Sequence, residues 1–338
     1  MDSMWWLDPV LIVIFVAVFV SIAIFCIMGQ ESFRVLRGPT RRLGQGIYNP
    51  SLISERQGVV RSDHISGGLV IVGRHMESVV QLIDPTTGRT KVLETPTNMV
   101  PGPGWCCGWT MSGVQDSRMF MFRKDPWCIA SVIGWKGSDD PQVNTMVLFK
   151  VSEPGHLIRL EAPHPGTQKN WAPFVYTTNF GDERLLVEYS LEPHVVLDIT
   201  PSFNRENKIT PHRKYESFGS FSGVEIEYGK FWSNTGRRLT SPPVKTERGW
   251  LGIGHRKHNN FNYVHFFYLF DFEPPFNIIS YSHEFKIQQP DRIQFCSGMR
   301  LKSKDEKIEL QYGVNDASAW TTDISLSDVW KMFSIKDK

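Results

Sequence analysis

The chain has 338 residues, 21% of them charged, and a formal net charge of +2 at pH 7. A charge this close to balance argues against nucleic acid as a partner, because nucleic-acid binding needs a basic surface. The five cysteines are scattered and match neither a disulfide framework nor a zinc-binding spacing.

The N-terminal segment has the composition of a membrane anchor. Residues 10–28 are almost entirely apolar and long enough to cross a bilayer as a helix, and Trp5 and Trp6 stand where interfacial aromatic anchors occur. A signal peptide would begin with basic residues, whereas this chain begins with acidic ones. A buried core helix is the alternative, but the run is long and has no polar face. We predict a single-pass anchor over residues 1–29, with the lipid bilayer as the partner of residues 10–28.

A basic segment follows the anchor. Residues 30–46 contain four arginines and several glycines, and they are predicted to form a linker. Because positive charge flanks the cytosolic end of membrane helices, these arginines favour a cytosolic location for the larger, C-terminal part of the chain.

Beyond the linker, the sequence predicts strands almost throughout. Short β-branched and aromatic runs alternate with turns rich in Gly, Pro and Asp. The predicted strands cover residues 68–73, 78–83, 119–122, 129–133, 145–149, 185–189, 195–198 and 264–268. One amphipathic helix is predicted over residues 325–334, opened by a Ser/Asp cap.

Short polar segments recur roughly every fifty to sixty-five residues, a cadence that is typical of the blades of a propeller. They are residues 48–53, 113–120, 169–174, 249–255, 295–299 and 312–316. The predicted fold class is therefore all-β, with one N-terminal transmembrane helix followed by a five-bladed β-propeller over residues 47–338. The chain shows no strand–helix alternation, no GxGxxG and no P-loop, so a nucleotide-binding Rossmann design is disfavoured.

Two polar segments contain candidate site residues. Asp116 lies beside Arg118 at the start of a predicted strand, where a carboxylate suits a general acid or a sugar hydroxyl, although it also suits a turn cap. Lys169, Asn170 and Trp171 offer a cation, an amide and a stacking face for an anionic, hydroxyl-rich ligand. The alternative for this trio is a solvated loop with one buried Trp.

The remaining candidates are single residues. His194 and His255 each stand at a strand end, where a histidine is often structural. Arg238 precedes a Pro-bounded turn, where it suits a phosphate clamp or a solvent-exposed position. No pair of carboxylates has a glycosidase spacing, and no metal ligand set or cofactor motif is present in the sequence, so neither a metal nor a cofactor is expected.

The ordered set of segments resembles a known family. Asn-Pro-Ser from Asn49, Gln-Asp-Ser-Arg ending at Arg118, Lys-Asn-Trp-Ala-Pro-Phe from Lys169, Tyr-Ser-Leu-Glu-Pro-His ending at His194, Arg-Leu-Thr-Ser-Pro-Pro from Arg238 and Tyr-Gly-Val-Asn-Asp ending at Asp316 occur in this order. Together they resemble the five-bladed propellers related to the β-mannoside phosphorylases of glycoside hydrolase family 130, a group that includes mannosyltransferase-like relatives. The resemblance covers about residues 45–325.

The resemblance implies an inverting transfer of a mannosyl-type sugar to or from phosphate, without a metal. Asp116 matches the family's candidate acid, and Arg118 matches its arginine. The other residues that the resemblance and the polar segments place at the substrate are Asn49, Lys169, Asn170, Trp171, His194, Arg238, His255 and Asp316. The expected partner is a sugar or sugar phosphate, possibly a nucleotide sugar.

The sequence also departs from the family. Gln115 replaces a Glu, Ser117 replaces a Pro, and Leu239 and Thr240 replace two glycines that would let the backbone approach a ligand. Two hypotheses remain open: a membrane-anchored glycosyltransferase or phosphorylase-like enzyme, and a catalytically inactive propeller that binds a glycan or a partner protein. Analogy with membrane-bound glycosyltransferases favours a lumenal propeller in the endoplasmic reticulum or Golgi, whereas the arginines favour a cytosolic one.

Overall fold

The computed structural model describes residues 34–66, 75–94, 110–136, 140, 143–201, 207–217, 238–257, 263–287, 293–302 and 306–333. Val35–Lys338 forms one compact unit and Met1–Arg34 a second. Among the described residues, no helix is both long and apolar enough to span a membrane. The predicted anchor, residues 10–28, and the predicted strand 68–73 lie outside the described residues.

The largest sheet has nine strands in the order β14-β10-β9-β8-β7-β5-β4-β3, with β6 paired to β5. Its neighbours along the chain pair antiparallel, whereas β5 and β7 pair in parallel. The strands are β3 (Tyr48–Leu52), β4 (Gly58–Ser66), β5 (His75–Asp84), β6 (Arg89–Val92), β7 (Thr110–Phe122), β8 (Asp125–Ile133), β9 (Thr145–Lys150), β10 (Ile158–Leu160) and β14 (Lys208–Ile209).

Two sheets follow in the middle of the chain. The first has four strands in the order β11-β12-β13-β15, namely β11 (Ala172–Thr177), β12 (Glu183–Leu191), β13 (His194–Asp198) and β15 (Arg213–Ser217). The second has seven strands in the order β1-β21-β19-β18-β16, with β17 paired to β18 and β20 to β19. These are β1 (Arg34–Leu36), β16 (Arg238–Leu239), β17 (Val244–Lys245), β18 (Trp250–Lys257), β19 (Tyr263–Phe270), β20 (Ile278–Tyr281) and β21 (Phe285–Ile287).

The last four-stranded sheet joins the two ends of the larger unit. Its order is β2-β24-β23-β22, made of β2 (Thr40–Gln45), β22 (Gln294–Lys302), β23 (Lys307–Val314) and β24 (Ser318–Ser325). Thr40 pairs with Thr322 and Gln45 with Ser318. The prediction of a linker over residues 30–46 is therefore wrong for the strand residues, because β24 offers β2 a complete edge for backbone hydrogen bonds.

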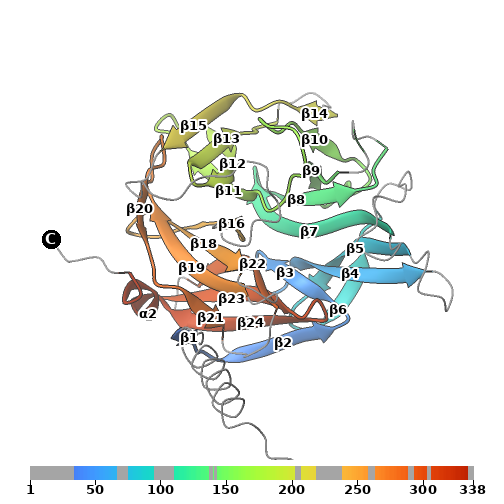
Figure 1. The fold of residues 1–338 in the computed structure, drawn as a ribbon, viewed down its shortest axis with the longest axis horizontal. Coiled ribbons are helices and arrows are strands. Elements are labelled where there is room, and N and C mark those ends of the chain that lie inside the picture. Colours follow the sequence, from blue (N-terminus) through green and yellow to red (C-terminus); the bar gives the residue numbers. More distant parts are fainter. Residues whose placement is uncertain are drawn as a thin grey trace, which may run out of the picture. The chain divides into compact units, whose positions relative to one another are not determined.

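The four sheets lie around a common centre (Figure 1). Their inner strands contact one another in sequence: β3 contacts β7 and β22, β7 contacts β11, β12 contacts β16, and β18 contacts β22. The ring of contacts therefore closes where β22 meets β3. This arrangement brings the first strands of sheets that are far apart in the sequence to one place.

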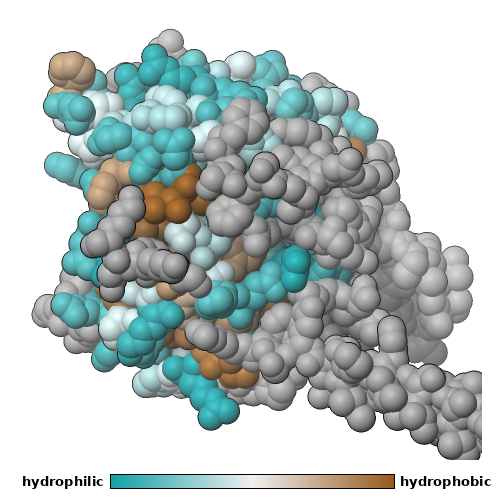
Figure 2. Space-filling view, turned by 60° about the vertical axis from the view of Figure 1, so that its left-hand side comes forward, coloured by the Kyte–Doolittle hydropathy of each residue, from teal (hydrophilic) through white to brown (hydrophobic). Residues whose placement is uncertain are grey.

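Aromatic residues fill the space between neighbouring sheets. Phe174 of β11 lies 4.9 Å from Trp250 of β18 between ring centroids, and 5.6 Å from Phe276 in an edge-to-face contact. Such pairs add to the stabilisation from burial alone. The face in Figure 2 is mostly hydrophilic with small apolar patches between, which agrees with an aromatic content directed inward.

The predicted strands that fall on described residues are confirmed. Residues 78–83, 119–122, 129–133, 145–149, 185–189, 195–198 and 264–268 all lie inside observed strands. The tail helix is also present but shorter, as α2 (Leu326–Trp330). Its cap is Ser325, whose side chain accepts a hydrogen bond from the backbone N–H of Asp328, so the predicted start is correct.

One glycine determines whether β5 and β7 can pair. Gly113 has φ +101°, and a Cβ built on it would lie 2.1 Å from the carbonyl oxygen of Ser78, its partner across the parallel pair. We expect Gly113→Ala to lower the free energy of unfolding by about 2–4 kcal/mol, because strain and a backbone clash add together. Urea unfolding measures this change.

Gly155→Ala is the matched control for this prediction. A Cβ at Gly155 meets nothing within 4 Å, and the residue does not adopt a positive φ. The expected change in unfolding free energy is within about 0.5 kcal/mol. Equal effects of the two substitutions would contradict the close approach of β5 to β7.

Candidate functional site

Asp116 occupies an irregular point in β7. The pairing with β8 shifts between Gln115 and Arg118, so the strand contains a bulge, and Asp116 adopts φ 50°. Residues other than glycine rarely adopt this conformation, although Asp and Asn do so more readily than most. The bulge turns the carboxylate out of the ladder and toward the centre of the ring of sheets.

Two asparagines near Asp116 share this backbone conformation. Asn49 has φ 47° within a register shift of β3, and Asn170 has φ 62° just before β11. Strained residues of this kind cluster at functional sites, where the surrounding structure holds them in place. Their agreement at the inner ends of three strand segments marks the place where a site is to be sought.

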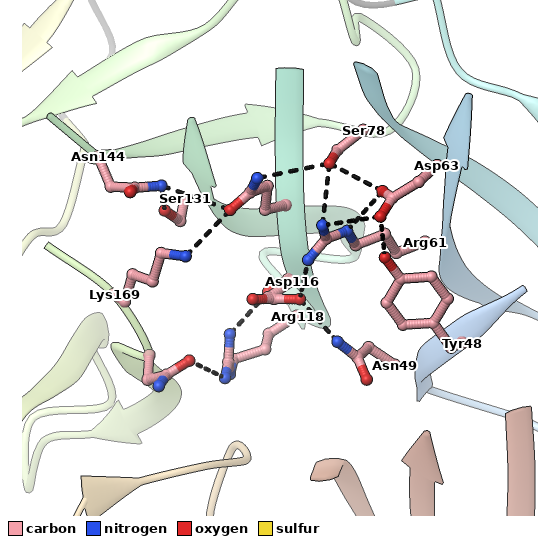
Figure 3. Close-up of polar contacts among 12 residues, drawn as sticks. Tyr48, Asn49, Arg61, Asp63, Ser78, Asp116, Arg118, Ser131, Asn144 and Lys169 are labelled. Carbon is pink, nitrogen blue, oxygen red and sulfur yellow. Dashed lines mark hydrogen bonds and ion pairs between the residues drawn. The ribbon is translucent and has the colours of Figure 1, made fainter. Parts of the chain in front are cut away.

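The carboxylate of Asp116 is held by two side chains (Figure 3). Asn49 Nδ2 donates to Asp116 Oδ1 at 2.7 Å, and Arg61 Nη1 donates to the same oxygen at 3.1 Å. Arg118 Nη1 donates to the backbone carbonyl of Asp116 at 2.6 Å. We call Asn49, Arg61, Gln115, Asp116 and Lys169 the central site.

Positive charge controls the ionisation of Asp116. Burial by itself would raise the pKa of this carboxyl, but the charges of Arg61, Lys169 and Arg118 and the hydrogen bond from Asn49 outweigh burial and lower the pKa to about 2. The side chain is therefore a carboxylate at neutral pH in the empty site.

The low pKa of Asp116 has a consequence for stability in acid. An unfolded Asp titrates near about 3.9, so the stabilisation from this carboxylate is complete above that pH and is lost as the pH falls toward 2. The expected loss is roughly 2 kcal/mol. Urea unfolding of the wild type and of Asp116→Asn between pH 5 and pH 2.5 measures it, and curves that fall in parallel would contradict the depressed pKa.

A second carboxylate orients Arg61. Asp63 accepts hydrogen bonds from Arg61 Nε at 3.0 Å and from Arg61 Nη2 at 3.1 Å, which makes the pair bidentate. Ser78 Oγ donates to Asp63 Oδ1 at 2.8 Å, and the Tyr48 hydroxyl donates to Asp63 Oδ2. The Arg61 guanidinium also lies over the ring of Tyr48. Arg61 is thus locked in the direction of Asp116.

Arg118 joins all four sheets rather than facing a ligand. The side chain is fully buried. Its Nε donates to the carbonyl of Thr240 at 2.8 Å, and its Nη2 donates to Asn170 Oδ1 at 3.0 Å. The guanidinium also lies 6.0 Å from the ring centroid of Phe295 in β22. Burial lowers the pKa of Arg118 to about 10. The prediction that Arg118 binds substrate is therefore wrong, because no part of its side chain reaches solvent.

Lys169 and Gln115 connect the central site to β8 and β9. Lys169 Nζ donates to Gln115 Oε1 at 3.1 Å. Burial lowers the pKa of Lys169, which the charge of Arg61 reinforces and Asp116, Asp316 and Asp63 oppose. The lysine is half-buried, so it is one of the site groups with access to solvent.

Arg238 and His255 lie together on the seven-stranded sheet. They pair across β16 and β18, and His255 Nδ1 is 2.9 Å from Thr240 Oγ1. Burial lowers the pKa of His255 well below its usual range, and the nearby charges of His265, Arg238, Arg118 and Lys257 act in the same direction. His255 is therefore neutral, and it reaches the central site through Thr240 and Arg118.

Asp316 lies in the turn between β23 and β24, at φ 49° beside Asn315 at φ 51°. Two successive residues with positive φ suit a tight hairpin turn, which accounts for this Asn-Asp pair. Its carboxylate has access to solvent but is surrounded by protein on most sides. This partial desolvation raises the pKa of Asp316, an effect that Asp116 and Asp63 reinforce and Arg61 and Lys169 oppose.

Two predicted substrate contacts are wrong. Trp171 is 1% exposed and packs edge-to-face on Tyr189 in the core, so it offers no face to a sugar. His194 is buried in a separate network, with Nε2 2.9 Å from Glu188 Oε1 and Nδ1 2.7 Å from the carbonyl of Phe276. Apolar packing positions the tryptophan, and the buried Glu188 holds the histidine away from Asp116.

The sequence analysis missed part of the central site. Arg61, Asp63 and Ser78 were not among its candidates, although Arg61 and Asp63 share one face of β4 because strand residues two apart point the same way. An Arg-x-Asp pattern in a strand was the available signal. Among the described residues, no group of three or more His, Cys, Asp or Glu side chains is arranged to hold a metal ion.

Comparisons with known proteins relate this fold to sugar-acting enzymes. No protein-family model matches the chain, and no curated protein matches it in sequence. A β-1,2-mannobiose phosphorylase from Listeria innocua has a similar structure, with TM-score 0.59, 14% identity, and coverage of 91% of this chain and 95% of that one. A glycosyl hydrolase from Bacteroides ovatus has TM-score 0.52, 12% identity, and coverage of 88% and 95%.

A third structure belongs to work on the GH130 family of mannoside phosphorylases, which contains hydrolases that target β-1,2 mannosidic linkages in Candida mannan. It has TM-score 0.50 and 13% identity, and covers 88% of this chain and 96% of that one. At such low identity, these similarities establish the fold. The resemblance to the glycoside hydrolase family 130 group is confirmed at that level.

Proposed function

We propose that the chain is an enzyme that transfers a mannosyl or related sugar to or from phosphate at the central site, with inversion and with Asp116 as the acid–base group. The observation that carries this proposal is the Asp116 carboxylate, held by Asn49 and Arg61 at the meeting point of the sheets and close to the cation of Lys169. Structural similarity to mannoside phosphorylases supports the choice of sugar class.

The charge state of Asp116 favours one direction of the reaction first. As a carboxylate, it accepts the proton of an acceptor hydroxyl while that oxygen bonds to the anomeric carbon of a sugar phosphate and the phosphate leaves. In the reverse direction a protonated Asp116 donates to the leaving glycosidic oxygen while phosphate attacks. A bound phosphate beside Lys169 offsets the positive charges that lower the pKa of Asp116, which makes protonation easier.

We further propose that the four sheets correspond to five blades. The nine-stranded sheet contains two units of consecutive antiparallel strands, β3–β6 and β7–β10, joined by the parallel pairing of β5 with β7. The other three sheets each supply one blade. Anchoring in an endomembrane through residues 10–28 remains a proposal from the sequence.

A second candidate function is a glycan-binding module without turnover. Asp116 is only 9% exposed and already accepts two hydrogen bonds, which suits a structural carboxylate as well as a catalytic one. The altered Gln115 and Ser117 elements agree with this reading.

The test uses the full chain, because truncation within residues 40–45 would remove β2 from its sheet. The protein is given phosphate with a panel of β-mannosides, and separately mannose 1-phosphate or GDP-mannose with sugar acceptors. Mass spectrometry detects the products. We expect a sugar phosphate or an extended glycoside, whereas glycan binding without any product would favour the binding module.

A further inference from the structure

Gln115 is buried beside the reactive carboxylate and lies between a cation and a hydroxyl. Its Oε1 accepts from Lys169 Nζ at 3.1 Å and from Asn144 Nδ2 at 3.5 Å. Its Nε2 donates to Ser78 Oγ at 3.4 Å. Two donors face one end of the carboxamide, so the positions of its oxygen and nitrogen follow from its neighbours.

The neighbours of Gln115 require an amide at this position. The single proton of Ser78 Oγ is donated to Asp63 Oδ1, and the same oxygen accepts from Arg61 Nη2 at 3.0 Å. Ser78 therefore has no proton left for residue 115 and serves it only as an acceptor. A carboxylate at 115 would direct its second oxygen at a lone pair, close to the carboxylate of Asp63.

The uncharged amide also sets the balance of charge. Among the described residues, five cations interact with one another or with three carboxylates around the centre; the cations are Arg61, Arg118, Lys169, Arg238 and Lys257, and the carboxylates are Asp63, Asp116 and Asp316. Positive charge is therefore in excess. A carboxylate at 115 would form an ion pair with Lys169 and reduce this excess where Lys169 approaches solvent.

We propose that Gln115 determines the charge of the ligand: by meeting Lys169 with a neutral amide, it keeps the central site selective for a ligand that bears a phosphate dianion. This inference rests on the proposed function and deepens it, because it assigns selectivity for the phosphate group to a residue that does not itself carry charge. Gln115 acts through Lys169 and through the potential at the site.

The isosteric substitution Gln115→Glu tests the proposal in the full chain. Calorimetric titration at pH 8 measures the affinity for inorganic phosphate, for mannose 1-phosphate and for the uncharged methyl β-mannoside. We expect affinity for the two anions to fall about tenfold or more, because one new negative charge lies within a few ångströms of the anion. Affinity for the methyl mannoside should change less than about twofold, since it carries no charge. For inorganic phosphate the loss should shrink at pH 5, where the ligand is a monoanion.

Three further variants separate charge from structure. Gln45→Glu makes the same chemical change at an exposed position of β2 and should leave all affinities unchanged. In a Lys169→Gln background, Gln115→Glu should lose most of its effect. Gln115→Met removes the hydrogen bonds without adding charge, so it should retain anion affinity within a few-fold, and it decides the matter if Gln115→Glu does not fold.

Specific outcomes would overturn the proposal. Equal losses for charged and uncharged ligands, or a loss with Gln115→Met as large as with Gln115→Glu, would show that residue 115 acts through structure rather than charge. A wild type that turns over glycosides but shows no difference from Gln115→Glu would overturn this inference and leave the proposed function standing. A wild type that binds neither phosphate nor a sugar phosphate would overturn both.

Discussion

Asp116→Asn is expected to reduce glycosyl transfer by roughly 10²- to 10⁴-fold, the usual contribution of a positioned acid–base group. The amide keeps the size of the side chain and a carbonyl oxygen for Asn49 and Arg61, but it neither accepts the acceptor's proton nor returns it. Product formation from mannose 1-phosphate and from phosphorolysis, followed by mass spectrometry, measures the loss in both directions.

Two comparisons protect this prediction. Asp182→Asn, in the exposed turn between β11 and β12, is the matched change outside the site and should leave activity unaltered. Binding of the methyl mannoside should persist in Asp116→Asn, because the loss concerns proton transfer. Full turnover by Asp116→Asn would remove Asp116 from the mechanism and favour another group as the acid–base residue.

Arg118→Met is expected to lower the free energy of unfolding by about 3–5 kcal/mol. The substitution keeps much of the volume but removes the donors to the carbonyls of Asp116 and Thr240 and to Asn170 Oδ1, all in places that exclude water. It also removes the positive charge that faces Asp116. Chemical unfolding at neutral pH measures the change.

Arg37→Met is the control for charge removal, since Arg37 is exposed. Its effect should remain within about 0.5 kcal/mol. If Arg118→Met were as stable as the wild type, the three carbonyl acceptors would have to find other donors, and the role of Arg118 in joining the sheets would be refuted.

Much of the fold was predictable from the residues themselves. Alternating β-branched and aromatic runs bounded by turns predicted the strands, and Ser325 with Asp328 predicted the start of α2. Asn49, Asp116, Lys169 and Asn170 were also predicted as site residues and do lie near one another. Their polar side chains beside short strands were a usable signal, because propeller sheets bring the ends of their inner strands together.

The errors share one physical cause. Trp171 follows Lys169 and Asn170 directly, yet it points into the core, since its apolar ring gains more from burial against Tyr189 than from exposure. His194 pairs with Glu188 in a buried network whose partners lie on different strands. Neither outcome follows from neighbours in the sequence. The strand at residues 40–45 was missed because its polar, arginine-containing sequence becomes a strand through pairing with β24.

The sequence by itself determined the all-β character, most strand positions and the helix cap, because these depend on side-chain periodicity and turn chemistry within a few residues. The tertiary structure alone decided which polar groups meet. Arg61 and Asp63 reach Asp116 across 55 and 53 positions of the chain, and Arg118 reaches Thr240 across 122. Such contacts form only when the sheets close around a centre, and the ionisation of Asp116 follows from that closure rather than from its own sequence neighbours.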